Sequence, residues 1–138
     1  MAAACVGVAL AIAAIGCERA RGEAVEMDAG PFVQKLTVCG PTFDPELAAL
    51  QAVTGACKRA HMNMRGDDRV EIAQDRALHG GRAFVVTLRD LTGDSVRDER
   101  FFLELVASVG GWRVATVRAT HRCWPTRGHE VFAAGPCS

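Results

Sequence analysis

Apolar and polar residues alternate with a period of two in several stretches of the chain after residue 69. This pattern is typical of β-strands that bury one face, because successive side chains point to opposite sides of a sheet. The alternation runs through residues 70–72, 84–89 and 101–109. These three stretches are therefore predicted to be strands.

A further strand is predicted from Trp112 to His121, with a bulge near Thr116 where the alternation slips by one residue. The connections between the strands are short. Leu91–Ser95 has the composition of a turn, and Gly110-Gly111 is predicted to be a two-residue hairpin loop, because glycine adopts the positive φ angles that such loops need. Connections this short join antiparallel neighbours, so the strands should form a meander.

One more strand is predicted ahead of these, over Phe32–Cys39. Phe32, Leu36 and Val38 would share its buried face, and Lys35 would point the other way. Residues 17–30 are mostly polar and lack a period. They are interpreted as a tether that precedes a single domain at residues 31–138.

A helix should begin at Pro45, because Asp44 can cap the first turn and proline needs no partner for its missing amide hydrogen. Gly55 falls in the middle of this predicted helix. The residues expected on its buried face are spaced by threes and fours. They are Leu47, Leu50, Val53, Cys57, Ala60 and Met64.

The predicted order is strand, helix and then antiparallel strands, which is an α+β arrangement. This order is similar to that of the cystatin-like and nuclear-transport-factor-like rolls, in which a curved sheet wraps one or more helices. Gly110-Gly111-Trp112-Arg113-Val114 is also similar to the last hairpin of many secreted bacterial members of the second group. The resemblance implies one helix packed on a curved antiparallel meander of about four to five strands.

The N-terminal end carries an uncharged apolar run, Ala2–Gly16, that stops at Cys17. It is shorter than the roughly 20 residues of a membrane-spanning helix but fits a secretory signal, predicted here as residues 1–16. Ala14-Ile15-Gly16-Cys17 resembles the lipobox of bacterial lipoproteins, which implies lipidation of Cys17 at the start of the mature chain. A plain signal peptide cut a few residues later and an uncleaved anchor are the alternatives. The expected location is the cell envelope, on the periplasmic or outer face of a membrane.

Sixteen basic and sixteen acidic residues leave the chain without net charge. Such a chain has no general attraction to nucleic acid or to an anionic membrane surface, so no nucleic-acid partner is expected. The sequence predicts contact with the membrane through the lipid anchor, and an envelope protein or an anionic polymer as a partner.

Four cysteines follow the predicted lipid site, and an even number suits two disulfides in an oxidising compartment. Cys123 and Cys137 bracket a tail that contains proline and glycine, and they are paired first. Cys39 then pairs with Cys57 by elimination.

Two groups of residues also have metal-binding chemistry. In a reducing compartment, His121, Cys123, His129 and Cys137 could bind zinc. His61-Met62-Asn63-Met64 places soft sulfur ligands beside an imidazole, which suits copper(I). Export favours the disulfide in the first case, and ordinary core and surface positions account for the second, so no metal and no other cofactor is expected.

Arginine and tryptophan gather in the last predicted strand and the tail, with no acidic residue between them. This is the best candidate for a binding surface, because both residue types are enriched at protein interfaces. Its members are Trp112, Arg113, Arg118, Arg122, Trp124 and Arg127. Alternatively, these arginines pair with acidic residues of neighbouring strands. Those acidic residues are Asp90, Asp94, Asp98, Glu99 and Glu104.

Positions predicted to face the interior are almost all aliphatic or Phe, with Gln34 and Gln74 as the polar ones. No acid–base pair can be named, and the sequence has no phosphate-binding glycine loop and no Gly-x-Ser-x-Gly turn. The Asp75–Arg82 hairpin also lacks the glutamine-valine-glycine sequence of cystatins. The sequence thus favours a non-catalytic binding or structural module of the envelope. A small-ligand or enzymatic roll with a polar pocket and a cystatin-like protease inhibitor are the alternatives.

Overall fold

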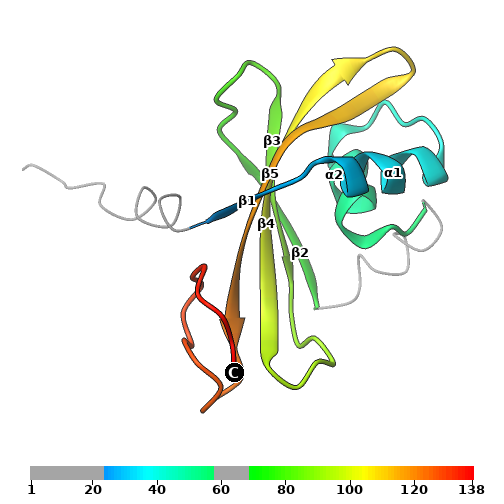
Figure 1. Ribbon diagram of the computed structural model, residues 1–138. Helices are drawn as coiled ribbons and strands as arrows, with labels where there is room; N and C mark the ends of the chain where they lie inside the picture. Colours follow the sequence, from blue (N-terminus) through cyan, green and yellow to red (C-terminus); the bar gives the residue numbers. More distant parts are fainter. Residues whose placement is uncertain (1–23, 58–68) are drawn as a thin grey trace, which may run out of the picture.

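Five antiparallel strands form one sheet in the computed structural model, which describes residues 24–57 and 69–138. Two helices in the described residues pack on one face of this sheet (Figure 1). The α+β class predicted from the sequence is confirmed, with two helices in place of one. In sheet order the strands are β1 (Val25–Met27), β5 (Gly111–Cys123), β4 (Val96–Ser108), β3 (Arg82–Leu88) and β2 (Val70–Asp75). The helices are α1 (Gly30–Cys39) and α2 (Pro45–Thr54).

The predicted meander is confirmed, because β2, β3, β4 and β5 follow one another in the sheet, each antiparallel to the next. The predicted bulge near Thr116 is present as well. Glu104 pairs with Thr116, whereas the next residue, Leu105, pairs with Val114. Ala115 is therefore the extra residue on β5.

The turn between β4 and β5 differs from the prediction by one residue. Ser108 pairs with Gly111, so the loop is Val109-Gly110, and Gly110 has the positive φ of 81°. Gly111 serves another purpose, because a side chain there would collide with the backbone carbonyl of Thr42. The second glycine thus allows the hairpin to lie against the α1–α2 connection.

The segment predicted as a strand, Phe32–Cys39, is part of helix α1, so that prediction is wrong. Phe32 and Leu36 are the buried residues of α1, and a spacing of four places two side chains on one face of a helix. Residues four apart share a face in a strand too, so the spacing of Phe32 and Leu36 fits a strand as well as a helix. Val38, which a strand would have buried with them, is 79% exposed.

The sheet gains an edge strand from the segment predicted as a tether. β1 pairs with β5, with Val25 opposite Ala119 and Met27 opposite Val117. A strand of three residues is too short to show a period in the sequence. α1 then begins at Gly30, just before the predicted start of the domain.

Helix α2 begins at Pro45 as predicted, and Asp44 caps it by accepting hydrogen bonds from two backbone amides of the first turn, at 3.0 and 3.3 Å. The predicted length is wrong, because Gly55 adopts a left-handed φ of 69° and ends the helix. Cys57 therefore lies beyond the helix. Two residues expected on the buried face, Ala60 and Met64, lie outside the described residues. Neither described helix is long and apolar enough to cross a membrane.

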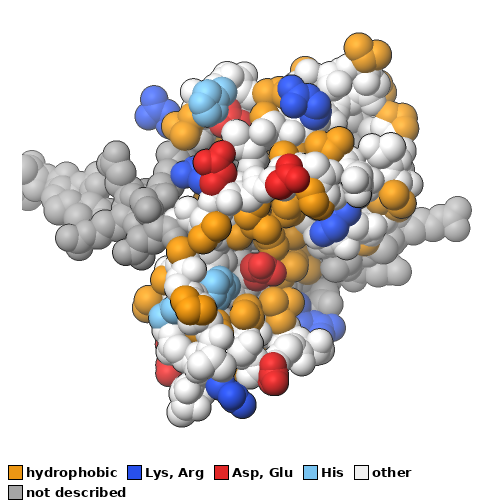
Figure 2. All heavy atoms as spheres, viewed as in Figure 1, with side chains coloured by type: hydrophobic (Ala, Val, Ile, Leu, Met, Phe, Trp, Pro, Cys, Tyr) orange, Lys and Arg blue, Asp and Glu red, His pale blue; other side chains and the backbone are white. Residues whose placement is uncertain are grey.

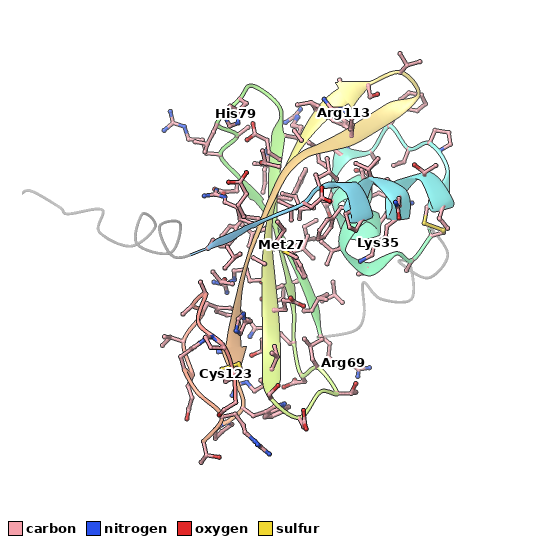
Figure 3. All side chains as sticks on the ribbon, in the orientation of Figure 1. Met27, Lys35, Arg69, His79, Arg113 and Cys123 are labelled. Carbon is pink, nitrogen blue, oxygen red and sulfur yellow. A yellow bond between two sulfur atoms is a disulfide. The ribbon has the colours of Figure 1, made fainter. Side chains whose placement is uncertain are left out.

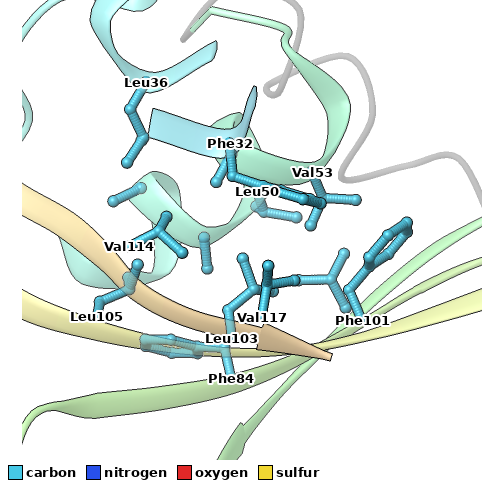
Figure 4. Close-up of a cluster of buried hydrophobic side chains, with 14 residues drawn as sticks. Phe32, Leu36, Leu50, Val53, Phe84, Phe101, Leu103, Leu105, Val114 and Val117 are labelled. Carbon is cyan, nitrogen blue, oxygen red and sulfur yellow. The ribbon is translucent and has the colours of Figure 1, made fainter. Parts of the chain in front are cut away.

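The hydrophobic core lies between the helices and the sheet (Figure 4). α2 presents alanines with no exposed surface, which allows it to lie close to the strands. Phe32 of α1 meets Phe101 of β4 edge to face, with ring centroids 5.9 Å apart. The largest buried side chains of the sheet in this space are Phe84, Val86, Phe101, Leu103, Leu105, Val114 and Val117. The space under the helices is therefore filled with apolar side chains.

Both predicted disulfides are confirmed. Cys39 at the end of α1 is joined to Cys57 after α2, with a Cα–Cα distance of 4.9 Å. Cys123 at the end of β5 is joined to Cys137 in the tail, with a Cα–Cα distance of 5.6 Å. Disulfides are typical of an oxidising compartment, so they support export.

Candidate functional site

The face of the sheet opposite the helices, here called the outer face, carries most of the polar side chains of the central strands. Leu103 of β4 belongs to the core, so its neighbour Glu104 points the other way, in register with Thr116 of β5. Figure 2 shows charged side chains of both signs and a histidine close together near the β2–β3 hairpin.

A cleft of about 230 Å³, here called the outer cleft, opens on this face between the β2–β3 hairpin and strands β1, β4 and β5. Phe102 and Ala83 give it an apolar part. Its charged and histidine residues are Glu26, Asp75, Arg76, His79, Glu104 and Arg118. Three acids, two arginines and a histidine give the cleft charges of both signs, with one more acid than arginine. The volume suits one side chain or a small polar group, because pockets for drug-sized ligands start at about 300 Å³.

Glu104 and His79 form a pair at the edge of the outer cleft. His79 Nδ1 lies 2.9 Å from Glu104 Oε2, and the backbone amide of His79 donates to Oε1 at 2.6 Å. Glu104 is only 5% exposed, whereas the His79 side chain is 67% exposed. An ionised carboxylate can only accept hydrogen bonds, so it holds the proton of the neutral imidazole on Nδ1. The exposed Nε2 is then left to accept a proton or a hydrogen bond from a ligand.

The β2–β3 hairpin reaches Glu104 because it has two glycines after His79. Gly80 adopts a positive φ of 80°, which turns the chain back toward β3. Any side chain at Gly81 would collide with the backbone carbonyl of Leu105, so only glycine allows this close approach to β4. His79 is thereby held over the carboxylate by the backbone as well as by its ring.

The environment of Glu104 keeps its carboxyl group ionised. Burial alone would raise the pKa of Glu104, but the hydrogen bonds from the ring and backbone amide of His79 outweigh it and lower the pKa below its ordinary value of 4.5. At neutral pH the outer cleft therefore contains a buried negative charge whose partner is an exposed imidazole.

Sequence reasoning missed this pair. It treated Glu104 as a charge partner of arginines and found no acid–base pair in the chain. The available signals were an acidic residue inside a strongly apolar strand and the sequence His79-Gly80-Gly81 in a hairpin. Neither signal shows that the two meet, because 25 residues separate them. The two polar residues that the sequence predicted to face the interior, Gln34 and Gln74, are both exposed.

The six residues predicted as a binding surface do not form one surface. Trp112 and Arg113 lie at the β4–β5 hairpin, whereas Trp124 and Arg127 follow the other end of β5. Eleven residues of β5 lie between the two tryptophans, and twelve steps of extended strand span about 40 Å. Figure 3 shows Arg113 and Cys123 at opposite ends of the sheet. Arg118 alone among the six lines the outer cleft.

Arg122 belongs to a buried charge network at the tail end of the sheet. Asp98 is 1% exposed and accepts hydrogen bonds from Arg122, from Arg97 at 3.0 Å and from the backbone amide of Asp90 at 2.9 Å. Burial would raise the pKa of Asp98, but these hydrogen bonds together lower it. The alternative drawn from the sequence, that the arginines pair within the sheet, is thus confirmed for Arg122.

Trp112 takes part in a second hollow, a groove of about 460 Å³ between the end of α1 and the β4–β5 hairpin. Its indole nitrogen donates to the carbonyl of Phe43 at 3.0 Å, and the ring packs against the core. Trp124 similarly donates to the carbonyl of Gly93 at 2.9 Å. Both tryptophans thus hold loops against the sheet.

Two of the predicted sites cannot be placed in the structure. The lipidation candidate Cys17 and the residues His61–Met64 lie outside the described residues.

The residues considered for a zinc site lie together where the tail meets β5. His121 and His129 lie beside the Cys123–Cys137 disulfide, and the centroids of their two imidazole rings are 5.1 Å apart.

The chain matches no protein-family model, no curated protein sequence and no solved structure at a significant level.

Replacement of Arg122 by Ser should lower the free energy of unfolding by roughly 2 kcal/mol, because it leaves the buried Asp98 with one side-chain partner fewer. This figure is below the cost for a fully buried pair, since Arg97 and the Asp90 amide remain. Urea unfolding measures it. Arg127→Ser is the control, because it changes an exposed residue of the tail and should stay within about 0.5 kcal/mol. Equal effects of the two changes would contradict the charge network.

The protein should lose the stabilising contribution of Glu104 in acid. Its pKa is lower folded than unfolded, so its contribution is complete above pH 4.5 and is lost as the pH falls toward the folded pKa. The stability difference between wild type and Glu104→Gln should therefore be largest near neutrality and shrink below pH 4.5. Urea unfolding over a pH series tests this, with the exposed Glu130→Gln as control. A difference that stays constant with pH would rule out the lowered pKa.

Proposed function

We propose that this chain is an exported lipoprotein of the bacterial cell envelope, and that it acts as a non-catalytic binding module through the outer cleft. The apolar run before Cys17 and the two disulfides support export. The observation that carries the binding role is the outer cleft itself, where the buried Glu104 orients the exposed His79 beside Arg118.

We also propose that the fold is a roll of the cystatin-like or nuclear-transport-factor-like kind. A helical segment before a four-stranded antiparallel meander supports a likeness to the cystatin-like and nuclear-transport-factor-like rolls. In enzymes of the second group the site lies inside the cone, between helices and sheet. Here Phe84, Phe101 and Leu103 fill that space. Binding is therefore assigned to the other face.

The ligand of the outer cleft is a polar segment of an envelope partner. Both acidic and basic side chains line the cleft, so a segment with both hydrogen-bond donors and acceptors would be recognised better than a purely anionic polymer. The volume of about 230 Å³ accepts one side chain, and the remaining contact would spread over the neighbouring outer face.

A second candidate function is catalysis in the same cleft. It is favoured by one observation: a buried carboxylate orients an imidazole whose second nitrogen is exposed, which is the arrangement of a general base. Among the described lining residues, Thr116 alone has an aliphatic hydroxyl group, so such an enzyme would have to activate water. Activity on a small substrate that disappears in both His79→Ala and Glu104→Gln would support this candidate.

The anchoring part predicts that Cys17→Ser moves the protein from the membrane fraction to the soluble fraction of the native host. Incorporation of labelled fatty acid should be lost with it, because the thiol is the expected acylation site. Cys5→Ser, within the predicted signal, is the control and should leave both unchanged. A mature protein that starts after Cys17 without lipid would refute the anchor.

The binding part predicts that a photo-crosslinking amino acid at Leu78, which lines the outer cleft, captures an envelope partner in living cells. The adduct should disappear when Arg118→Ser or His79→Ala is added, and persist with Arg113→Ser, which lies outside the cleft. A crosslinker at the exposed Val131 in the tail should not give it. Adducts that are indifferent to Arg118 would place the partner elsewhere.

A further inference from the structure

The C-terminal tail brings four metal-ligating side chains to one place. His121 and Cys123 are two residues apart on β5, so they point to the same side of the strand, and His129 and Cys137 approach from the tail. One donor atom from each of the four residues lies within 4.8 Å of all the others. Two imidazole nitrogens and two sulfurs are a donor set of tetrahedral zinc sites.

The tail is held against β5 by backbone hydrogen bonds as well as by the disulfide. His121 and Ala133 exchange two of them, at 3.0 and 2.9 Å. The Cys123 amide donates to the carbonyl of His129 at 2.8 Å. These bonds do not involve sulfur, so they keep His121, Cys123 and His129 together when the disulfide is opened.

His129 already has the contacts that orient a metal-binding histidine. Its Nδ1 lies 2.9 Å from the carbonyl of Val131, and its Nε2 lies 2.7 Å from the carbonyl of Gly135. A ligating histidine uses one nitrogen for the metal and donates the other N–H to a carbonyl or carboxylate. One of these two contacts would be given up, and the other would fix the ring.

We propose that reduction of the Cys123–Cys137 disulfide converts the tail into a binding site for a thiophilic divalent metal such as Zn²⁺, with His121, Cys123, His129 and Cys137 as ligands. A dithiol reductant supplies two electrons and two protons, so the S–S bond becomes two thiols and the reductant becomes a disulfide. Each thiol loses its proton when its sulfur binds the metal, and two thiolates neutralise the charge of Zn²⁺. A sulfur in the disulfide cannot bind in this way, so the oxidised and metal-bound states exclude each other.

The site is accessible to solvent. Cys123 is buried, whereas the other three residues are half-buried, and Figure 2 shows histidine side chains at the surface in the region of the tail. Figure 3 shows the Cys123 disulfide at the far end of β5 from Arg113 and separate from His79. Metal binding here is therefore independent of the outer cleft, and neither proposal depends on the other.

The test uses the exported full-length protein, oxidised or reduced with a phosphine, and titrated with Zn²⁺ in competition with a chromophoric chelator. The reduced protein should bind one metal ion per chain, and the oxidised protein none. Co²⁺ in place of Zn²⁺ should give the thiolate-to-metal absorption of a tetrahedral sulfur site. Zn²⁺ should also protect Cys123 and Cys137 from alkylation, as measured by peptide mass spectrometry.

Variants separate this site from adventitious thiol binding. His121→Ala and His129→Ala should each weaken binding by more than the roughly tenfold that loss of an outer-shell partner costs. Cys39→Ser/Cys57→Ser, which removes the other disulfide, and His79→Ala are the controls and should bind as wild type does. No binding by the reduced protein whose amide NMR spectrum shows an intact sheet would overturn the proposal. Binding that survives the loss of both histidines would overturn it as well.

Discussion

The structure depends on the burial of one face of a twisted antiparallel sheet under two short helices. Apart from the register shifts between β4 and β5, side chains of β3, β4 and β5 alternate between the two faces, so an apolar residue placed under the helices puts its neighbours on the outer face. Leu103 and Leu105 are both fully buried although the bulge at Ala115 lies beside them. Because the helix side is filled, polar chemistry in this sheet is concentrated on the opposite side.

Glycines then decide what reaches the outer face and the ends of the sheet. Gly81 allows the β2–β3 hairpin to touch β4, and Gly111 allows the β4–β5 hairpin to touch the α1–α2 connection. At the other end, Gly128 allows the tail to pass close to the Cys123 sulfur. In each case a Cβ atom would come too close to another atom. Glycine therefore allows these loops to contact the rest of the structure at points where no other residue would fit.

Buried carboxylates organise the outer face into two regions. Glu104 holds His79 at one end, and Asp98 holds Arg97 and Arg122 at the other. Each is nearly inaccessible to water, yet each has a pKa below its ordinary value because hydrogen bonds to the ionised form outweigh the cost of burial. The two carboxylates differ in their partners. The arginines that bind Asp98 stabilise the fold, and one of them, Arg122, also stacks on Phe132 of the tail together with Arg100. His79 keeps one nitrogen exposed, which makes its end of the face the site of binding.

The sequence by itself determined the strands of the meander, the bulge near Thr116, the start of α2 and both disulfides. These features follow from local rules: a period of two, a slip in that period, a capping Asp44 before Pro45, and a tail bracketed by cysteines. It could not distinguish α1 from a strand, since Phe32 and Leu36 share a face in either, and it could not detect the three-residue β1. Tertiary structure alone decided that His79 meets Glu104 and that Trp112 and Trp124 are kept apart. The physical reason is that register and hairpin geometry bring these residues together or separate them over tens of residues, whereas a local pattern carries information only about near neighbours.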